Sequence, residues 1–422
     1  MRVSSITYTA DFDVRCPDKL APKALRVKVC NQWDEIEKLQ PAWDSILAEN
    51  PRLTMFSTRE WLASWWSAYG MGVPLESFTF HSENQAVGIA PFFRDFVSFL
   101  GIRKLAQLCL VGAGSGDSDN LDLVIRPGFE EAAATAFLAN LEGRNDWDLC
   151  WLETLPAAST IGNLLPAKLT ALGWPYQVSR VPNWSVSLPQ TWNAYLEGLS
   201  PEFRPLLTRY PKRLESRYAC RLSRCQTEAD LERYLPVLFD LHQRRWVEAG
   251  QPGAFASAER RQFYRALASA LLSRGWLDFW ILELGDLPVA VQFCCRHEGT
   301  VYLLQEGFDP EYTKEKVGYA LRAKVLQHYI QTGVQRYDFM GGSDPYKQKF
   351  GAEQGSYLTI RFAKPRSLGT LFLHVEESKQ RSRSWLRTHL PAWLVSQVRA
   401  LRMRRHRRQS TGAGQSLNEK RL

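Results

Sequence analysis

The sequence lacks the features that mark membrane-spanning, secreted and zinc-binding chains. It has no run of about 18 consecutive apolar residues, which excludes an ordinary transmembrane helix. Met1 to Lys19 carries scattered charges without an apolar core, so it does not predict a secretory signal peptide. The eight cysteines form no CxxC pair, and several lie in apolar runs such as Phe293-Cys294-Cys295. Such cysteines are typical of the core of a protein in a reducing compartment. We therefore expect a cytoplasmic protein.

Most of the chain also lacks an excess of positive charge, although the net charge of the whole chain is +9. Twelve Lys or Arg residues and a single acid, Glu419, lie within residues 379–422, so this segment carries +11 and residues 1–378 sum to −2. A near-neutral body is not an obvious nucleic-acid binder. Residues 391–408 combine an apolar helical face with clustered arginines. Three interpretations stay open for them: a helix on an anionic membrane, an RNA contact, or a solvated disordered end.

Length and periodicity predict two α/β domains. A chain of 422 residues exceeds the size of one ordinary core. Apolar spacing predicts helices over residues 27–47, 58–69, 128–141, 167–172, 231–248, 258–273 and 316–332. It predicts strands over residues 77–81, 86–93, 121–125, 146–155, 277–284, 288–296, 300–308 and 336–340, with one more near residue 176. We expect a leader (1–24), two domains (25–185 and 186–365) and a basic tail (366–422).

The two halves repeat one order of elements. Trp147-Asp148-Leu149-Cys150 matches Tyr337-Asp338-Phe339-Met340, and the strand hairpin near residue 80 matches the one near residue 285. Only the second copy continues into Gly341-Gly342 and the pair Tyr346-Lys347. The chemistry is therefore predicted to lie in or beside the second copy.

The segment from Tyr337 to Gly351 places ionisable groups at one strand end, where open α/β sheets bind ligands. Gly341 and Gly342 let the backbone approach a ligand closely. Asp338 is a candidate base or orienting group, or it ties down a neighbouring loop. Tyr346 is a candidate proton donor to a leaving group, or its ring packs. Lys347 is a candidate mobile cation for a phosphate, or a surface lysine.

A strand meander, a helix with an early glycine and a following strand resemble the acetyltransferase superfamily called GNAT. The ordered set of Leu241-His242 with Arg245-Trp246, Phe308-Asp309-Pro310, Gly318-Tyr-Ala-Leu321 and Asp338-Phe339-x-x-Gly342 is similar to the BioF2-like, or CelD-like, acetyltransferase family, a relative of the FemABX peptidyltransferases. The resemblance covers roughly residues 25–365. It implies two tandem GNAT-like domains, each a mixed, mostly antiparallel sheet flanked by helices, and transfer of an acyl or aminoacyl group.

The resemblance also implies acyl-CoA as co-substrate, with its pyrophosphate at the helix N-terminus near Lys316 and Gly318. Members of the superfamily have Arg or Gln three residues before the glycine, whereas this chain has Glu315. The carboxylate of Glu315 would repel a pyrophosphate unless it points away.

Several polar residues have two interpretations each. Arg204 and Arg245, beside Phe203 and Trp246, suit phosphate or carboxylate binding and equally suit structural ion pairs. For the remaining polar residues the structural reading is favoured: a turn at Asp309, a core or capping role for His242, and an Asx-turn loop rather than a metal cluster at Asp117, Asp119 and Asp122. We expect no metal.

The favoured function is acyl transfer from acyl-CoA to an amine or hydroxyl of a sugar, cell-envelope or exopolysaccharide precursor. One alternative is aminoacyl transfer from a charged tRNA. Another is a non-catalytic component of a polysaccharide-synthesis complex. Residues 379–408 are a candidate for peripheral contact with the inner face of the membrane.

Overall fold

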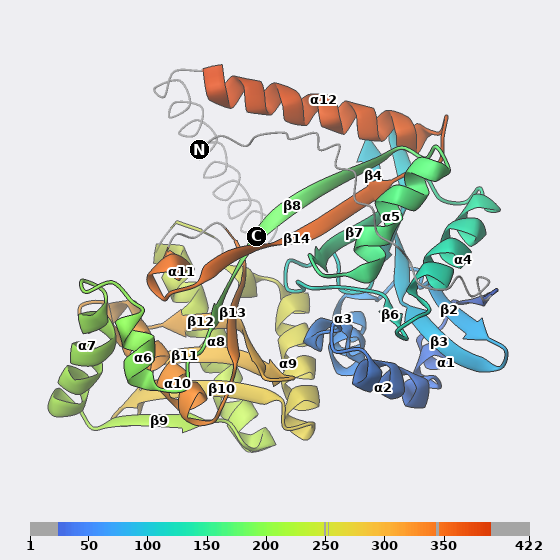
Figure 1. Cartoon of the computed structure of the whole chain (residues 1–422). Coiled ribbons are helices and arrows are strands. Elements are labelled where there is room, and N and C mark those ends of the chain that lie inside the picture. The colour runs from blue at the N-terminus through green and yellow to red at the C-terminus, as the bar shows by residue number, and fades with distance from the viewer. Residues whose placement is uncertain (1–23, 249, 252, 343–345, 390–422) are drawn as a thin grey trace, which may run out of the picture.

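The computed structural model describes residues 24–248, 250–251, 253–342 and 346–389, which form two lobes joined by long strands (Figure 1). Several predicted features lie outside these ranges. They are residues 1–23 of the leader with Cys16, the turn residues 343–345, and the segment 391–408 with its apolar helical face. No helix of the described part is long and apolar enough to cross a membrane.

Fourteen strands and twelve α-helices make up the described chain. The strands are β1 (Arg26–Cys30), β2 (Ser77–Ser82), β3 (Gln85–Ala90), β4 (Phe92–Phe99), β5 (Arg103–Leu110), β6 (Val124–Ile125), β7 (Leu149–Pro156), β8 (Tyr176–Ser187), β9 (Cys220–Arg224), β10 (Leu277–Leu284), β11 (Leu287–His297), β12 (Thr300–Phe308), β13 (Arg336–Gly341) and β14 (Glu353–Phe362). The helices are α1 (Trp33–Glu37), α2 (Gln40–Glu49), α3 (Arg59–Tyr69), α4 (Glu130–Glu142), α5 (Thr160–Ala171), α6 (Trp192–Glu197), α7 (Arg204–Arg217), α8 (Glu228–Glu248), α9 (Ala258–Ser273), α10 (Val317–Gln331), α11 (Tyr346–Lys349) and α12 (Leu368–His389).

The strands form a four-stranded sheet, β1-β2-β3-β6, and a ten-stranded sheet, β4-β5-β7-β14-β8-β13-β12-β11-β10-β9. Each half contributes one parallel pair, β5 with β7 and β12 with β13, among otherwise antiparallel neighbours. The predicted fold class, α/β with mixed and mostly antiparallel sheets flanked by helices, is confirmed.

The last strands of the two halves are exchanged. β8, which ends the first half, pairs with β13 of the second, while β14 pairs with β7 of the first. β8 and β14 also pair with each other over their length, from Tyr176 with Phe362 to Ser185 with Glu353. The sheet is therefore continuous across the predicted boundary at residue 185.

The predicted helix over residues 27–47 is wrong at its start. Arg26 to Cys30 forms β1, antiparallel to β2, because Val27 and Val29 alternate with Arg26 and Lys28 at the period of a strand. The helical part begins only at Trp33 and is divided between α1 and α2. β5, β9 and β14 were not predicted.

The cysteines and the helices of the second half form packed apolar cores. Of the seven cysteines that the structure describes, all are free and six are buried, which confirms the prediction of core thiols for those six; Cys220 is half-buried. The second half packs α7 and α10 on one face of its sheet and α8 and α9 on the other.

The position of α8 depends on Gly307 of β12. A Cβ at position 307 would lie 2.7 Å from the backbone nitrogen of His242 and 3.0 Å from the carbonyl carbon of Leu241. Such contacts with backbone atoms cannot be relieved by rotating a side chain, so only glycine lets the helix lie this close. The close approach brings His242 and Arg245 of α8 over the end of β12.

β12 and β13 separate after a short parallel contact. They pair only from Thr300 with Arg336 to Tyr302 with Asp338, although β12 continues to Phe308. The remainder of β12 therefore has one edge without a strand partner among the residues that the structure describes. The candidate site opens along that edge.

Candidate active site

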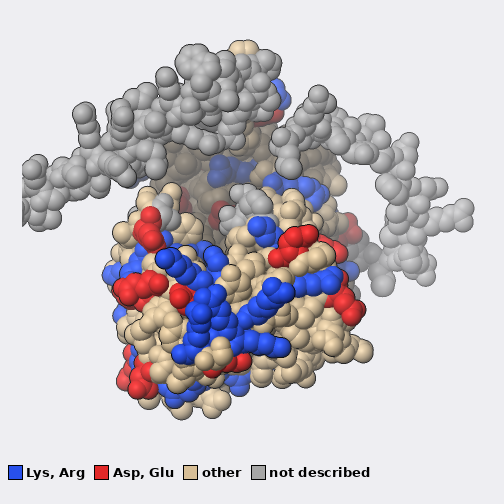
Figure 2. All heavy atoms as spheres, turned by 90° about the vertical axis from the view of Figure 1, so that its left-hand side faces the viewer, with Lys and Arg blue, Asp and Glu red and all other residues tan. Residues whose placement is uncertain are grey.

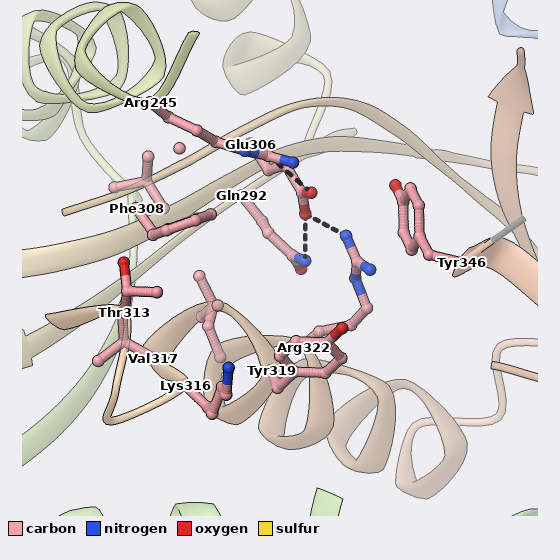
Figure 3. A pocket seen from close by; sticks show the side chains of 14 residues that line it. Arg245, Gln292, Glu306, Phe308, Thr313, Lys316, Val317, Tyr319, Arg322 and Tyr346 are labelled. Carbon is pink, nitrogen blue, oxygen red and sulfur yellow. Dashed lines mark hydrogen bonds and ion pairs between the residues drawn. The ribbon is translucent and has the colours of Figure 1, made fainter. Parts of the chain in front are cut away.

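Two neighbouring spaces lie along the free edge of β12. The first, about 250 Å³, surrounds the N-terminus of α10 and is called the helix-end cavity. The second, about 540 Å³, lies at the end of β13 and is called the strand-end pocket. Arg245, Glu306 and Tyr346 line both, so these three side chains form a wall that the two spaces share. Figure 3 shows them among the side chains of the helix-end cavity.

The helix-end cavity combines an apolar lining with a positive helix end. Val291, Phe308 and Leu321 line it together with the first turn of α10. In the described chain the backbone N–H groups of Val317, Gly318 and Tyr319 have no hydrogen-bond acceptor, because the first turn of a helix leaves its donors unpaired. This geometry suits an anion at one end and an apolar chain along the rest.

Lys316 precedes α10 in the left-handed conformation, with φ of 57°, and lines the helix-end cavity. Gly318 lines it as well. Glu315 is not among the described residues that line the cavity. The unfavourable carboxylate that the sequence indicated is thus outside the cavity wall, while an ammonium group from the next residue is part of it.

Glu306 is held between two arginines. It forms ion pairs with the buried Arg322 and, at 3.2 Å, with Nη1 of Arg245, and it accepts a hydrogen bond from Gln292 at 3.4 Å (Figure 3). Burial alone would raise the pKa of Glu306, but Arg322 and Arg245 outweigh it and hold the pKa well below the usual range. Glu306 is therefore a fixed anion and a poor base at neutral pH.

The strand-end pocket contains a carboxylate from the other half of the chain. Asp119 lies in the loop after β5, and its Oδ2 accepts a hydrogen bond of 2.8 Å from the Gly341 N–H at the end of β13. A Cβ at position 341 would lie 3.0 Å from that oxygen, so glycine permits the approach. Burial raises the pKa of Asp119 to about 6, although the Gly341 N–H and Lys347 lower it in part. Asp119 therefore titrates close to neutral pH.

Lys347 is not the mobile cation that the sequence indicated. Its side chain is buried, and Nζ donates hydrogen bonds to the carbonyl oxygens of Gly341 at 2.6 Å and Met340 at 3.3 Å. It thereby fixes a backbone in which Met340 has the unfavourable φ of 63°. Lys347 is a positioning residue whose charge also acts on Asp119.

Asp338 lies beneath the pocket rather than in its wall. It is buried, its Oδ1 accepts a hydrogen bond of 2.8 Å from the Met340 N–H, and it lines neither space within the described chain. Burial raises its pKa to about 6, partly offset by the Met340 N–H and Arg336. Its contacts match the alternative interpretation, in which the aspartate ties down a loop.

The structure brings together most of the other predicted site residues. Those in the strand-end pocket are Arg245, Trp246, Gly341, Gly342, Tyr346 and Lys347. Arg204 is not among them, because its guanidinium donates hydrogen bonds to the carbonyl oxygens of Leu199 at 3.0 Å and Glu197 at 2.8 Å, after α6. The contacts of Arg204 are those of a helix cap.

The residues interpreted as structural behave accordingly. Asp309 accepts a hydrogen bond from the Glu311 N–H at 3.0 Å, which confirms the predicted turn, and pairs with Arg244 at 2.7 Å. Asp117 forms a buried ion pair of 2.9 Å with Arg260. His242 is buried as expected, and burial lowers its pKa to about 4, so the imidazole is neutral. His242 nonetheless lines the strand-end pocket.

The sequence did not indicate Glu306, Arg322 or Gln292 as site residues, and it assigned Asp119 to a turn. A charged residue at an inward position of a buried strand (Glu306) and of an apolar helix (Arg322) was the available signal. No local pattern connects Asp119 to Gly341, which is 222 residues away.

Comparisons with known proteins agree with this fold. Residues 202–348 match the model of the acetyltransferase (GNAT) domain family. The structure titled FemX superposes with a TM-score of 0.55 at 11% identity, covering 76% of this chain and 95% of its own.

Two further structures superpose less well. A conserved protein of unknown function from Bacteroides thetaiotaomicron gives a TM-score of 0.47 at 14% identity, covering 77% of this chain and 97% of its own. L-PGS from Bacillus licheniformis gives 0.44 at 13%, covering 77% and 97%. No curated protein matches the chain.

Proposed function

We propose that the chain is an acyltransferase of the BioF2-like, or CelD-like, type that moves an acyl group from acyl-CoA to an amine or hydroxyl of a sugar or cell-envelope precursor. The GNAT match over residues 202–348 supports acyl transfer. The observation that carries the proposal is the pair of spaces that share the wall of Arg245, Glu306 and Tyr346. Two reactants can enter from opposite sides and meet at that wall.

The helix-end cavity is proposed as the donor site. The unpaired N–H groups of Val317 and Gly318 and the ammonium of Lys316 fit the pyrophosphate of CoA. The apolar surface of Val291, Phe308 and Leu321 fits the uncharged arm that leads to the thioester.

The strand-end pocket is proposed as the acceptor site, and Asp119 as the base. The acceptor's nitrogen or oxygen forms a bond to the thioester carbonyl carbon while the Asp119 carboxylate takes the proton from the attacking group. The resulting oxyanion collapses, the carbon–sulfur bond breaks, and the thiolate leaves with the bonding pair. Tyr346 is the proposed proton donor to the thiolate, and burial raises its pKa, which keeps the hydroxyl protonated before the transfer.

Blocking the helix-end cavity tests the donor assignment. A Cβ at Gly318 meets only Phe308, at 3.5 Å, so Gly318→Ala fits and adds helix propensity. Gly318→Leu extends the side chain into the cavity. We expect calorimetry with acetyl-CoA to show wild-type affinity for Gly318→Ala and at least a tenfold loss for Gly318→Leu, which corresponds to ~1.4 kcal/mol.

The thermal unfolding midpoint of both variants is measured alongside, because a loss of fold would also abolish binding. Equal binding of acetyl-CoA by Gly318→Leu and Gly318→Ala would place the donor elsewhere. Absence of thioester binding by the wild type would reject the proposed function itself.

A second candidate is aminoacyl transfer from a charged tRNA, and one surface favours it. Figure 2 shows Lys and Arg side chains gathered on the face of the lower lobe that carries α7. Arg209, Lys212, Arg213 and Arg217 are exposed there, and none has an ion-pair partner among the described residues. α7 adjoins the helix-end cavity, because Phe203 at its start contacts the ring of Tyr319 at 5.9 Å. A polyanionic donor would fit this face.

Charge reversal separates the two donors. We expect Arg209→Glu with Arg213→Glu to leave kcat/KM for an acyl-CoA within about twofold, because the helix-end cavity is unchanged. A tRNA donor predicts instead a loss of roughly tenfold or more, together with a smaller dependence of activity on salt concentration. Activity that is lost on ribonuclease treatment would support the tRNA donor.

A further inference from the structure

The hairpin of β4 and β5 has an exposed apolar tip. Ile102 N donates to the Phe99 carbonyl oxygen at 3.1 Å, and Leu100 and Gly101 at the centre of the turn both have positive φ, 54° and 72°. The side chain of Leu100 is 62% exposed and that of Ile102 is 91% exposed. The tip thus presents two aliphatic side chains to the surroundings.

Leucine is an unfavourable residue at position 100 for two reasons, its positive φ and its exposure to water. A side chain at positive φ is strained, and turns with positive φ prefer Asn, Asp or Gly. An aliphatic side chain that remains in water also contributes none of the stabilisation that its burial would give. We expect Leu100→Asn to remove both costs and to keep the turn, so the stability of the fold does not account for an apolar tip.

Basic side chains flank the tip on both faces of the hairpin. Arg103 lies opposite Phe99 and Lys104 lies opposite Ser98, so the two point to opposite faces. Both are exposed, and neither has an ion-pair partner within the described residues. The single acid in the two strands is Asp95, farther from the tip.

The hairpin is supported from below. The ring of Phe99 contacts that of Phe372 in α12 at 5.8 Å, and Leu105 is buried in the same cluster. Figure 1 shows the strands rising to the start of α12. The strands that carry the tip are therefore held in place by packing against α12.

We propose that the β4–β5 tip inserts into the surface of an anionic lipid bilayer. Leu100 and Ile102 enter the region between headgroups and acyl chains, while Arg103 and Lys104 contact lipid phosphates on either side. This docking surface is independent of the proposed acyl transfer. A second copy of the chain is the less suitable occupant, because two such tips would bring four positive charges together.

Co-sedimentation of the full chain with vesicles tests the proposal. The vesicles are phosphatidylcholine alone or phosphatidylcholine with phosphatidylglycerol. We expect wild type to bind the anionic vesicles preferentially, and Leu100→Asn with Ile102→Asn to lower the partition coefficient roughly tenfold. Met71→Asn is the matched control, since Met71 is 87% exposed in another turn and should leave partitioning unchanged.

The folding of the tip variant is checked by its thermal midpoint, which should equal or exceed that of wild type because Asn tolerates positive φ. Arg103→Glu with Lys104→Glu should abolish the preference for anionic vesicles. Wild-type partitioning of the tip variant would overturn the proposal. So would a shift from dimer to monomer in the tip variant without loss of vesicle binding, which would assign the tip to a second copy.

Discussion

Asp119→Asn should lower kcat by roughly 10²- to 10⁴-fold, the usual contribution of a positioned general base. The amide keeps an oxygen that can accept the hydrogen bond from the Gly341 N–H, so the local geometry should persist. Because burial places the pKa of Asp119 at about 6, kcat/KM of the wild type should rise with pH through that value. Steady-state kinetics between pH 4.5 and 8 measures both effects.

The stability of Asp119→Asn has an expected sign. The pKa of Asp119 is higher in the folded state than in the unfolded chain, so ionisation disfavours the folded state as pH rises from about 4 to 6. Replacing the carboxylate by a neutral amide removes this effect above pH 6. The thermal midpoint at pH 7.5 should therefore not fall, and a large fall would attribute the lost activity to unfolding.

A variant of Lys347 provides a control, because the pH dependence of kcat/KM would not change if the lysine acted only on stability. Its ammonium lowers the pKa of Asp119, so Lys347→Met should shift the acidic limb of the kcat/KM profile to higher pH. A limb that stays in place in Lys347→Met, or persists in Asp119→Asn, would show that another group is the base.

Glu306→Ala should destabilise the fold by about 3–5 kcal/mol, because it leaves the buried guanidinium of Arg322 without its carboxylate. Arg322 is also packed over the ring of Phe350, at 4.7 Å, and cannot move into solvent without opening that contact. Urea unfolding followed by tryptophan fluorescence measures the change.

Two comparisons make this result specific. Glu306→Ala combined with Arg322→Met should recover much of the loss, since the unpaired charge is then removed. Glu35→Ala breaks the exposed ion pair with Lys28 and should leave the unfolding midpoint nearly unchanged. If Glu306→Ala were as mild as Glu35→Ala, the cluster would not be the fixed wall described above.

The parts of the fold with strong local periodicity could be predicted from the sequence. α9 and the meander of β10, β11 and β12 begin and end within a few residues of their predicted positions, because apolar spacing and turn residues both define them. The exchange of β8 and β14 could not be predicted, since pairing between distant strands leaves no local pattern.

Some residues of the candidate site also have a local sequence signal, whereas others depend on contacts between distant segments. Tyr346 and Lys347 follow a glycine pair at a strand end, which is a local signal, and both line the strand-end pocket. The burial that makes Lys347 a structural cation depends on the carbonyl groups of a folded turn. Asp119 reaches the pocket only through the packing of one half against the other, so its neighbours determine its role.

A crystal structure of the chain with a bound acyl-CoA would show whether the donor lies in the helix-end cavity and reaches the strand-end pocket. We expect the pyrophosphate at the N–H groups of Val317 and Gly318, and the acyl carbonyl at the wall of Arg245, Glu306 and Tyr346. We also expect room for an acceptor atom about 3 Å from the Asp119 carboxylate. A thioester bound outside the helix-end cavity, or with its carbonyl out of reach of the strand-end pocket, would contradict the proposed donor and acceptor sites.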